Sequence, residues 1–533
     1  MLIKIKGSTL IGIQAIAITI EVNVSMGQGY NVVGLPDSSV KESLDRTESA
    51  IKANGFHMPR TKVLVNLSPA DLKKTGAAFD LPIAIGLIAA SEQLSYTNPL
   101  DAYLIMGELG LDGQLRPIKG VLSMAMQAKE EGVLGFILPF ENIPEARMVE
   151  GLNVFGFHQL SEVVHFLKDE AAPTTYENRK LIANENRSLN ADESRKVNNS
   201  RFIQSQKNLP KLEDIKGQMH CKRALEIACA GGHNLIFIGP PGTGKTMLAK
   251  SILSILPPLN QQEALETTRI YSACNNSNTV DRLYSERPFR EPHHTISNIA
   301  MIGGGSHPQP GEISLAHNGV LFLDELPEFN RNVIEVLRQP MEEGIVHIAR
   351  AKMHISYPAR FILLAAMNPC PCGFYNHPTK ECYCSAKAIQ RYLHKISGPL
   401  LDRIDLHVEV APISYTELHE KCTGITAQEV TVKVVAAKKL QENRFYNQES
   451  LFFNAQMSSA QLKQYCPLHS DAKKLLQTAM EKFQLSARAH DRIIKVARTI
   501  ADLAMSTTIE SIHLSEAIQY RNLDRSNWGK FKD

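Results

Sequence analysis

The stretch GPPGTGKT, from Gly239 to Thr246, constrains the fold of this chain more than any other feature. A glycine, four further residues and then Gly-Lys-Thr is the spacing of a phosphate-binding loop between a strand and a helix. The apolar run from Leu235 to Ile238 precedes the loop, and a helical pattern from Met247 to Leu256 follows it. The required order of strand, glycine loop and helix is therefore present, and it predicts a nucleotide-binding α/β domain.

This loop predicts ATP and Mg²⁺ as its ligands. Its glycines let backbone N–H groups turn toward the phosphates, and the helix that follows adds the positive end of its dipole. Lys245 reaches the outer phosphates, and the hydroxyl of Thr246 is a ligand for Mg²⁺. The residues assigned to nucleotide binding are Gly239, Pro240, Pro241, Gly242, Thr243, Gly244, Lys245 and Thr246.

The composition is that of a globular protein with more than one core. The chain has 533 residues, 43% of them apolar and 21% charged, which suggests roughly three domains. The net charge of +3 is too small to indicate nucleic acid, so any DNA contact must come from local loops. The alternating run from Leu10 to Val24, with Glu21 near its end, predicts a strand and not a signal peptide. No run of about 18 apolar residues occurs, and we expect a cytoplasmic protein with no membrane partner.

The pattern along the chain predicts three domains and one linker. Residues 1–170 alternate strand-like and helical runs, as an independent α/β domain does. Residues 171–209 are polar and form the linker. Residues 210–412 carry the ATP motifs on alternating strands and helices, and residues 413–533 are helical. In the first domain we expect strands at 62–67, 102–107 and 133–138, and helices at 39–53, 81–91 and 120–131.

A second motif, VLFLDE, ends in Asp324 and Glu325. An apolar run that ends in acids is the form of a buried parallel strand that delivers carboxylates to the carboxyl edge of a sheet. Asp324 would hold Mg²⁺ directly or through water, and Glu325 would orient or deprotonate the attacking water. In isolation the run could also be an ordinary strand end, but its position after the phosphate loop favours the ATPase interpretation.

Two further residues complete the pattern of an ATPase. The apolar run from Phe361 to Ala366 ends shortly before Asn368, which suits a polar side chain beside the γ-phosphate. The stretch GPLLDRID then brings Arg403 to where the ATPase domain closes. In this order the motifs resemble the AAA+ ATPases, which implies that Asn368 is sensor 1 and Arg403 an arginine finger. Because a neighbouring subunit can supply such a finger, the resemblance implies a homo-hexameric ring. The alternative role of Arg403 is a salt bridge with Asp402 or Asp405.

Longer motifs lie around the acidic strand. They are RPFREPHHT (287–295), GGG (303–305), PGEISLAH (310–317), ELPEF (325–329) and LRQPME (337–342). These motifs are similar to those of the magnesium-chelatase-like AAA+ proteins, and specifically of the ComM (YifB) competence family. The resemblance implies an ATP-driven DNA motor that promotes helicase-like branch migration on single-stranded or branched DNA during integration of incoming DNA. A chelatase-type motor that remodels a protein partner is the alternative.

In this family, loops project into the pore of the ring. By resemblance, Ile296 to Ser314 is the helix-2 insert, and Val346 to Ile355 is the pre-sensor hairpin. Alternation along the hairpin puts Arg350 and Lys352 near its turn. Exposed cations there could follow DNA phosphates without reading bases. They could equally be the solvated end of a hairpin.

The C-terminal part resembles the lid of the AAA+ ATPases. A helix is expected over Ala489 to Ala504, directly after Arg488. Arg488 aligns with the arginine of sensor 2, and Arg492, one turn later, is the alternative. Either arginine could instead be a surface residue.

Four cysteines follow Asn368 closely, as Cys370, Cys372, Cys382 and Cys384. Two close pairs across a short loop can converge on Zn²⁺ as a structural site, because four protein ligands leave no open position for catalysis. His377 could replace one of the ligands. The alternative is a set of reduced thiols in a loop.

The N-terminal domain contains the motifs GELGLDGQLRPI (107–118), VNLSPAD (65–71) and FDLPIA (79–84). With these motifs it resembles the Lon-type domain, of ribosomal S5 domain 2-like fold. Lon proteases use a serine and lysine pair as an activated nucleophile. Ala78 and Leu122 align with those two positions, so we expect a domain that cleaves no peptides.

Overall fold

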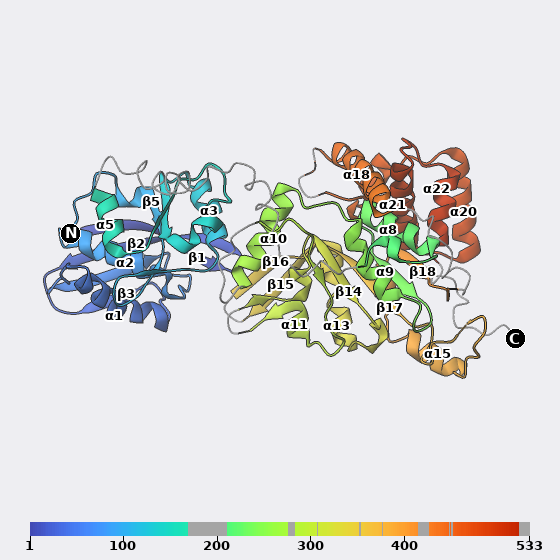
Figure 1. Ribbon diagram of the computed structural model, residues 1–533, viewed down its shortest axis with the longest axis horizontal. Coiled ribbons are helices and arrows are strands. Elements are labelled where there is room, and N and C mark those ends of the chain that lie inside the picture. The colour runs from blue at the N-terminus through green and yellow to red at the C-terminus, as the bar shows by residue number, and fades with distance from the viewer. Residues whose placement is uncertain are drawn as a thin grey trace, which may run out of the picture. The chain divides into compact units, whose positions relative to one another are not determined.

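The computed structural model describes residues 1–168, 210–274, 283–305, 308–350, 353–375, 377–413, 426–446, 448 and 451–521 (Figure 1). Their contacts divide the chain into two compact units. The first unit takes in the described parts of residues 1–203 together with residues 264–284. The second takes in residues 204–263 and 285–533, again in their described parts. The expected linker at 171–209 lies outside the described residues.

A seven-stranded sheet in the order β3-β4-β2-β1-β5-β8-β9 forms the centre of the first unit. Strands β1 and β2 are an antiparallel hairpin in which Ile5 lies opposite Ile20, and alternate residues of both strands are buried. The apolar run from Leu10 to Val24 therefore forms the end of β1 and most of β2. The strands are β1 (Leu2–Ile11), β2 (Gln14–Ser25), β3 (Tyr30–Val33), β4 (Lys62–Ser68), β5 (Tyr103–Ile105), β6 (Glu108–Leu109), β7 (Leu115–Arg116), β8 (Gly135–Pro139) and β9 (Val154–Phe157).

The helices of the first unit cover this sheet. Every residue of α2 is buried, as expected of a helix that is apolar on all sides. Its first residue, Asp80, is held by Arg46 Nε at 2.8 Å and by the hydroxyl of Ser43 at 2.5 Å. This ion pair joins α2 to α1. The helices are α1 (Ser38–Ala53), α2 (Asp80–Ala90), α3 (Val121–Glu130), α4 (Ile143–Ala146) and α5 (Leu160–Lys168), close to the ranges that periodicity predicts.

Helix α10 (Gln261–Cys274) follows the phosphate-loop region in sequence, yet residues 264–284 belong to the first unit. Arg269 Nε donates to the carbonyl of Ile13 and to the hydroxyl of Ser123, both at 2.9 Å. Ser272 Oγ donates to the buried carboxylate of Glu145 at 2.5 Å. The compact units and the sequence-based domains thus divide this segment differently, and the domain limits stay a prediction.

The second unit is built on a five-stranded sheet in the order β11-β14-β17-β10-β18. All four neighbouring pairs in this sheet are parallel. The central strands are buried along almost their whole length, which is typical of parallel strands covered by helices on both faces. The strands are β10 (Leu235–Ile238), β11 (Phe289–Arg290), β14 (Gly319–Leu323), β17 (Phe361–Met367) and β18 (Leu406–Glu409).

Shorter elements and a helical region complete the second unit. Helices α18 to α22 pack together, drawn in orange to red in Figure 1. The mixed α/β class with a parallel core and a helical C-terminal region is confirmed, whereas the S5 domain 2-like fold of the first unit stays a prediction. No helix among the described residues has the length and apolar character needed to cross a bilayer. The helices are α8 (Met219–Gly231), α9 (Lys245–Ser251), α11 (Asn298–Ile302), α12 (Glu312–Leu315), α13 (Arg331–Glu335), α14 (Arg338–Glu343), α15 (Ala386–Leu393), α16 (Gly398–Leu401), α18 (Ala427–Arg444), α19 (Ser459–Tyr465), α20 (Ser470–Phe483), α21 (Ala487–Leu503) and α22 (Ser511–Gln519), and the remaining strands are β12 (Gly303–Gly304), β13 (Gln309–Pro310), β15 (Ile345–Arg350) and β16 (Met353–Pro358).

Candidate functional site

The phosphate loop connects β10 to α9, as its spacing predicts. Gly242 and Gly244 have φ angles of 79° and 82°, in the left-handed region that favours glycine. Gly239 is required for a different reason, because a Cβ there would lie 2.4 Å from the carbonyl oxygen of Val410. Helix α9 ends at Ser251 and continues only as a 3-10 turn, so the regular helix is shorter than the pattern predicts.

Lys245 lies buried inside the loop. Its Nζ donates to the carbonyls of Gly239 and Pro240, each at 2.8 Å, and to Oδ1 of Asn368 at 3.1 Å. Burial lowers the pKa of Lys245, and the nearby carboxylates of Asp324 and Glu325 act in the opposite direction. The ammonium group thus joins the phosphate loop to Asn368, and two residues singled out by sequence lie in contact.

The two residues expected to hold Mg²⁺ also lie in contact. Thr246 Oγ1 donates to Asp324 Oδ2 at 2.6 Å, and Asp324 follows the last residue of β14. Hydroxyl and carboxylate oxygens are the donors that Mg²⁺ prefers, and it binds through few protein ligands beside substrate phosphates. The donor set of Thr246 and Asp324 therefore fits Mg²⁺.

Glu325 has an unusual backbone conformation. Its φ and ψ are 52° and 47°, the left-handed region, which costs a residue other than glycine about 1–2 kcal/mol. The chain turns sharply here: the N–H of Glu325 donates to Asp324 Oδ1 at 2.9 Å, and the N–H of Glu328 donates to the carbonyl of Glu325 at 2.7 Å. The turn leaves the carboxylate of Glu325 exposed at the sheet edge, and strain of this kind is found at functional sites.

The strand order explains how Asn368 meets the phosphate loop. Strand β17 lies between β10 and β14, with Ile238 paired to Met367 and Leu323 to Ala365. The carboxyl ends of parallel strands meet at one edge of the sheet. Asn368 follows β17 directly, so it lies between the loop and the acidic pair.

Arg403 lies at the other edge of the same sheet. Its carbonyl accepts from the side chain of Asn234, the residue before β10. The five steps from Asn234 to Gly239 span about 16 Å at roughly 3.3 Å per residue of strand, more than an arginine side chain can bridge. Arg403 pairs with Glu342 at 2.6 Å and is only 13% exposed. The partner is thus neither Asp402 nor Asp405, the two alternatives that sequence offers.

The two lid arginines are also near this second edge. Arg488, at the start of α21, is 65% exposed, and its NH1 lies 3.7 Å from Asp402. Arg492, one turn later, is 17% exposed and binds Asp405 at 2.7 Å. Of the two candidates for sensor 2, Arg488 is the more exposed, whereas Arg492 forms an ion pair with a buried carboxylate.

Sequence reasoning missed the buried polar network behind these arginines. His233 Nδ1 lies 3.1 Å from Asp405 Oδ2, and its Nε2 lies 2.8 Å from Thr499 Oγ1. Burial alone would raise the pKa of Asp405, but Arg492 and His233 outweigh it and hold the pKa well below its usual range. The sequence did contain one signal for this network. Asp405 lies between two apolar residues just before a buried strand, and a buried charge needs polar partners.

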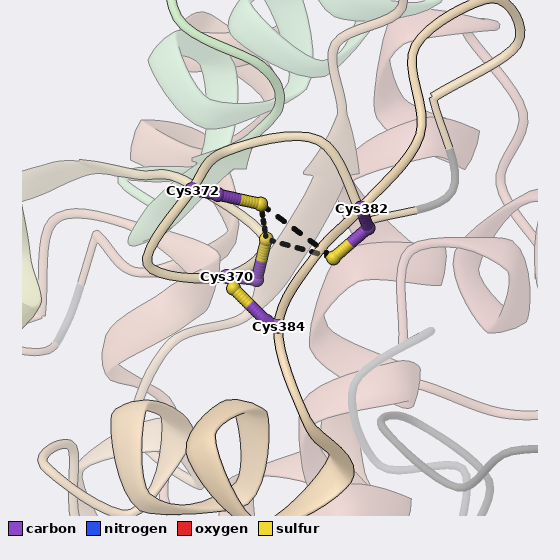
Figure 2. A group of neighbouring side chains, drawn as sticks. All are labelled: Cys370, Cys372, Cys382 and Cys384. Atoms are coloured by element: carbon purple, nitrogen blue, oxygen red, sulfur yellow. Dashed lines mark hydrogen bonds between the residues drawn. The ribbon is translucent and has the colours of Figure 1, made fainter.

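The four cysteines converge as their spacing predicts. The distances between sulfur atoms are 3.3 Å for Cys370 and Cys372, 3.7 Å for Cys370 and Cys382, and 3.5 Å for Cys372 and Cys382. All four Sγ atoms lie within 4.8 Å of one another and face a common centre (Figure 2). Tetrahedral Zn²⁺ with Zn–S bonds of about 2.3 Å sets sulfurs about 3.8 Å apart. The donor set therefore fits Zn²⁺, while His377 Nδ1 accepts from the N–H groups of Thr379 and Lys380.

Two other sequence-predicted features have different outcomes. The hairpin forms, with Arg350 paired to Met353 across the turn, but the side chain of Arg350 and the whole of Lys352 lie outside the described residues. In the first unit, Ala78 lies in a 3-10 turn and Leu122 is buried in α3. Both side chains are hydrocarbon and supply neither a nucleophile nor an amine.

Comparisons with known proteins give a consistent result. Three family models match: magnesium chelatase, subunit ChlI, at residues 211–418; subunit ChlI of Mg-chelatase, at 20–142; and the ChlI C-terminal region, at 424–521. The chain is 44% identical over 520 residues to the protein YifB of Salmonella typhimurium, which covers 97% of this chain and 96% of YifB. It is 43% identical over 517 residues to the competence protein ComM of Haemophilus influenzae, 96% of each chain. A more distant match, 23% over 322 residues, is the DNA replication licensing factor mcm6 of Dictyostelium discoideum, covering 56% of this chain and 32% of mcm6.

Proposed function

The chain belongs to the magnesium-chelatase-like AAA+ family that contains YifB and ComM, a family whose fold implies ATP hydrolysis, and from this premise we propose that it is a cytoplasmic, ring-forming DNA motor. The proposed activity is ATP-driven branch migration on single-stranded or branched DNA during integration of incoming DNA. The proposed assembly is a homo-hexamer.

One observation supports the proposal of a ring: the groups to which we assign hydrolysis lie at two opposite edges of one sheet. Lys245 and Asn368 are in contact at the carboxyl edge, whereas the backbone of Arg403 is bound at the amino edge by Asn234. An arginine finger acts on the transferred phosphoryl group and can come from a neighbouring subunit. A second copy of the chain would bring its Arg403, with Arg488 beside it, to the site that one copy leaves incomplete.

Within one site the residues would divide the work as follows. Lys245 and the loop N–H groups would bind the outer phosphates, and Thr246 with Asp324 would hold Mg²⁺, which neutralises phosphate charge when bound. Glu325 would orient or deprotonate the attacking water. Asn368, beside Lys245, would position that water against the γ-phosphate.

The proposal of DNA as substrate rests on similarity. The name of ComM includes competence, and the more distant relative mcm6 is named for DNA replication. Arg350 and Lys352 remain the candidate pore residues, because cationic side chains suit phosphates of any sequence.

We further propose that Cys370, Cys372, Cys382 and Cys384 hold a structural Zn²⁺. The four Sγ atoms form one compact group, and thiolate ligands of this number leave no position for substrate. The ion would stabilise the loop that carries the four cysteines.

Strand displacement and branch migration on forked DNA test the proposed function. Wild-type protein is expected to move DNA junctions with ATP and to hydrolyse ATP faster when DNA is present. Lys245→Ala is expected to lose ATP binding, and Glu325→Gln to bind ATP but hydrolyse it about 100-fold or more slowly. A wild-type protein that moves no DNA, and whose ATPase rate DNA leaves unchanged, would contradict the motor. ATPase stimulation by a protein partner alone would favour the chelatase-type alternative.

A further inference from the structure

The cysteine loop presents an exposed aromatic ring. Tyr383 stands between Cys382 and Cys384, and it is 86% exposed while the two flanking sulfurs point into the cluster (Figure 2). Nearby, Lys380 lies with its Nζ 4.9 Å from the centre of the Phe374 ring. With the proposed Zn²⁺ bound, the compact sulfur group would fix the backbone on both sides of Tyr383 and hold its ring out on a short, anchored support.

Helix α15 continues from this loop and carries cations on its outer face. It begins after Ser385, whose hydroxyl accepts from the N–H of Ala388. Ile389 and Tyr392 are buried, whereas Lys387 and Arg391 are exposed. Residues four apart lie on the same face of a helix, and like charges at that spacing weaken it. Across the described residues, neither Lys387 nor Arg391 has a side-chain ion pair to offset this repulsion.

Positive charge is concentrated in this region of the chain. Residues 377–395 contain four lysines and arginines against one carboxylate, Glu381, a local formal charge of +3. The whole chain of 533 residues has a net charge of only +3. The charge of Lys395 is compensated by Glu328, whose carboxylate lies 3.3 Å from Lys395 Nζ. A basic surface with a projecting aromatic ring is the combination by which proteins bind single strands, through phosphates and through stacked bases.

We propose that Tyr383, Lys387 and Arg391 form a binding surface for single-stranded DNA, here termed the loop platform. The proposal rests on the proposed DNA motor function and names one place where the strand is held. A base stacks on Tyr383, and the phosphates that follow it lie along Lys387 and Arg391. A duplex does not satisfy this surface, because its bases are stacked on each other and their faces are not available to a tyrosine ring.

The loop platform lies close in sequence to the nucleotide site. Asn368 is two residues before Cys370, whose sulfur also accepts from the N–H of Tyr375 at 3.3 Å. Asn368 itself contacts Lys245. A strand bound at the loop platform is thus joined to the residue beside the γ-phosphate by a short segment that the sulfur cluster holds.

Fluorescence polarisation of a fluorescein-labelled oligothymidylate, with full-length protein, tests this surface. Tyr383→Ala is expected to weaken binding about tenfold or more, because stacking contributes that much per base, and Tyr383→Trp is expected to retain it. Tyr446→Ala is the matched control, since Tyr446 is 89% exposed at the end of another helix. Lys387→Ala with Arg391→Ala is expected to reduce the slope of log affinity against log salt by about 1.4, because single strands lose roughly 0.7 per phosphate contact.

The outcomes separate this proposal from the motor function. If wild-type protein binds no oligothymidylate, the loop platform is overturned, whereas the motor function is decided separately by junction movement on forked DNA. If wild-type protein binds and Tyr383→Ala binds equally well, only the loop platform is overturned. If Tyr383→Ala dissociates the hexamer but leaves the affinity for oligothymidylate unchanged, this surface is a subunit interface. That result would also overturn the loop platform. Because Tyr383 is exposed, the variants are expected to keep the melting temperature of wild type.

Discussion

Replacing Arg403 with alanine is expected to abolish ATP hydrolysis without abolishing ATP binding. An arginine finger contributes about 10³ to 10⁵ in kcat, which corresponds to about 4–7 kcal/mol of the barrier. The loss cannot arise within one protomer, because the bound backbone of Arg403 lies about 16 Å from the phosphate loop along β10. The affected site is therefore expected to be that of the next subunit.

Mixing two inactive variants measures this directly. Arg403→Ala keeps its phosphate loop, and Lys245→Ala keeps its finger. In rings assembled at random from equal amounts of the two variants, half of the sites have the intact phosphate loop of an Arg403→Ala subunit. Half of those sites lie next to a Lys245→Ala subunit, which supplies an intact finger. About a quarter of the wild-type ATPase rate is therefore expected to return. If Arg403 acts within its own protomer, no site in the mixture has both groups, and a mixture as inactive as its components would refute the reasoning.

Glu342→Gln is the matched control for this experiment. Glu342 is the ion-pair partner of Arg403 at 2.6 Å and is half exposed. If Arg403 matters only through this pair, the two substitutions should lower the ATPase rate equally. If Arg403 is the finger, Glu342→Gln keeps most of the activity, because the guanidinium remains.

Three further results are expected. Asp405→Asn should lower the free energy of unfolding at pH 7 by about 3–5 kcal/mol, since it leaves the buried guanidinium of Arg492 without its carboxylate partner. The pKa of Asp405 is depressed in the folded protein, so its contribution to stability is present above the unfolded pKa of about 3.9 and is lost as pH falls. Urea unfolding should therefore show a smaller difference in stability between wild type and Asp405→Asn at pH 3 than at pH 7. Equal stability of the two proteins at pH 7 would contradict the buried pair. Metal analysis should find about one Zn²⁺ per protomer in wild type and almost none in Cys370→Ser, while wild type purified without chelator and lacking zinc would exclude the metal. Replacing Arg350 and Lys352 with alanine should weaken stimulation of the ATPase by DNA at unchanged ATP affinity, and full stimulation would exclude the hairpin from DNA binding.

The arrangement of the candidate ATP site could be predicted from sequence because most of it depends on local rules. The conformation of Gly242 and Gly244 depends on the loop itself, and the positions of Asp324 and Asn368 follow from apolar runs that end at one sheet edge. Only the order of strands was needed in addition, and it brings Asn368 to Lys245. The convergence of the cysteines was likewise predictable, because their pairs are close in sequence.

The ion pairs at the other edge could not be predicted in the same way. Asp402 and Asp405 flank Arg403 in sequence, yet they lie beside Arg488 and Arg492 from a helix more than 80 residues later. Which of the two arginines could serve as sensor 2 depends on the exposure of their side chains. Both lie on one face of α21, because they are four residues apart. Periodicity cannot separate them, since it records only that they share a face. Tertiary packing decides that one is buried against Asp405.

The separation of the loop from the arginines also constrains how copies of the chain can assemble. An isologous dimer pairs one surface patch with itself, so it completes the site only if the loop and Arg403 lie in the same patch. Here the parallel sheet lies between them, so an interface in which Arg403 completes the site would join the loop edge of one copy to the arginine edge of the next. Such head-to-tail contacts close as rings or continue as filaments. Arg492 is bound to Asp405 two residues from Arg403, and Asp405 is tied through His233 to Thr499 of α21. If Arg403 is the arginine finger of a ring, a movement of α21 would shift the group that serves the neighbouring site, and hydrolysis at one site would then alter the geometry of the next.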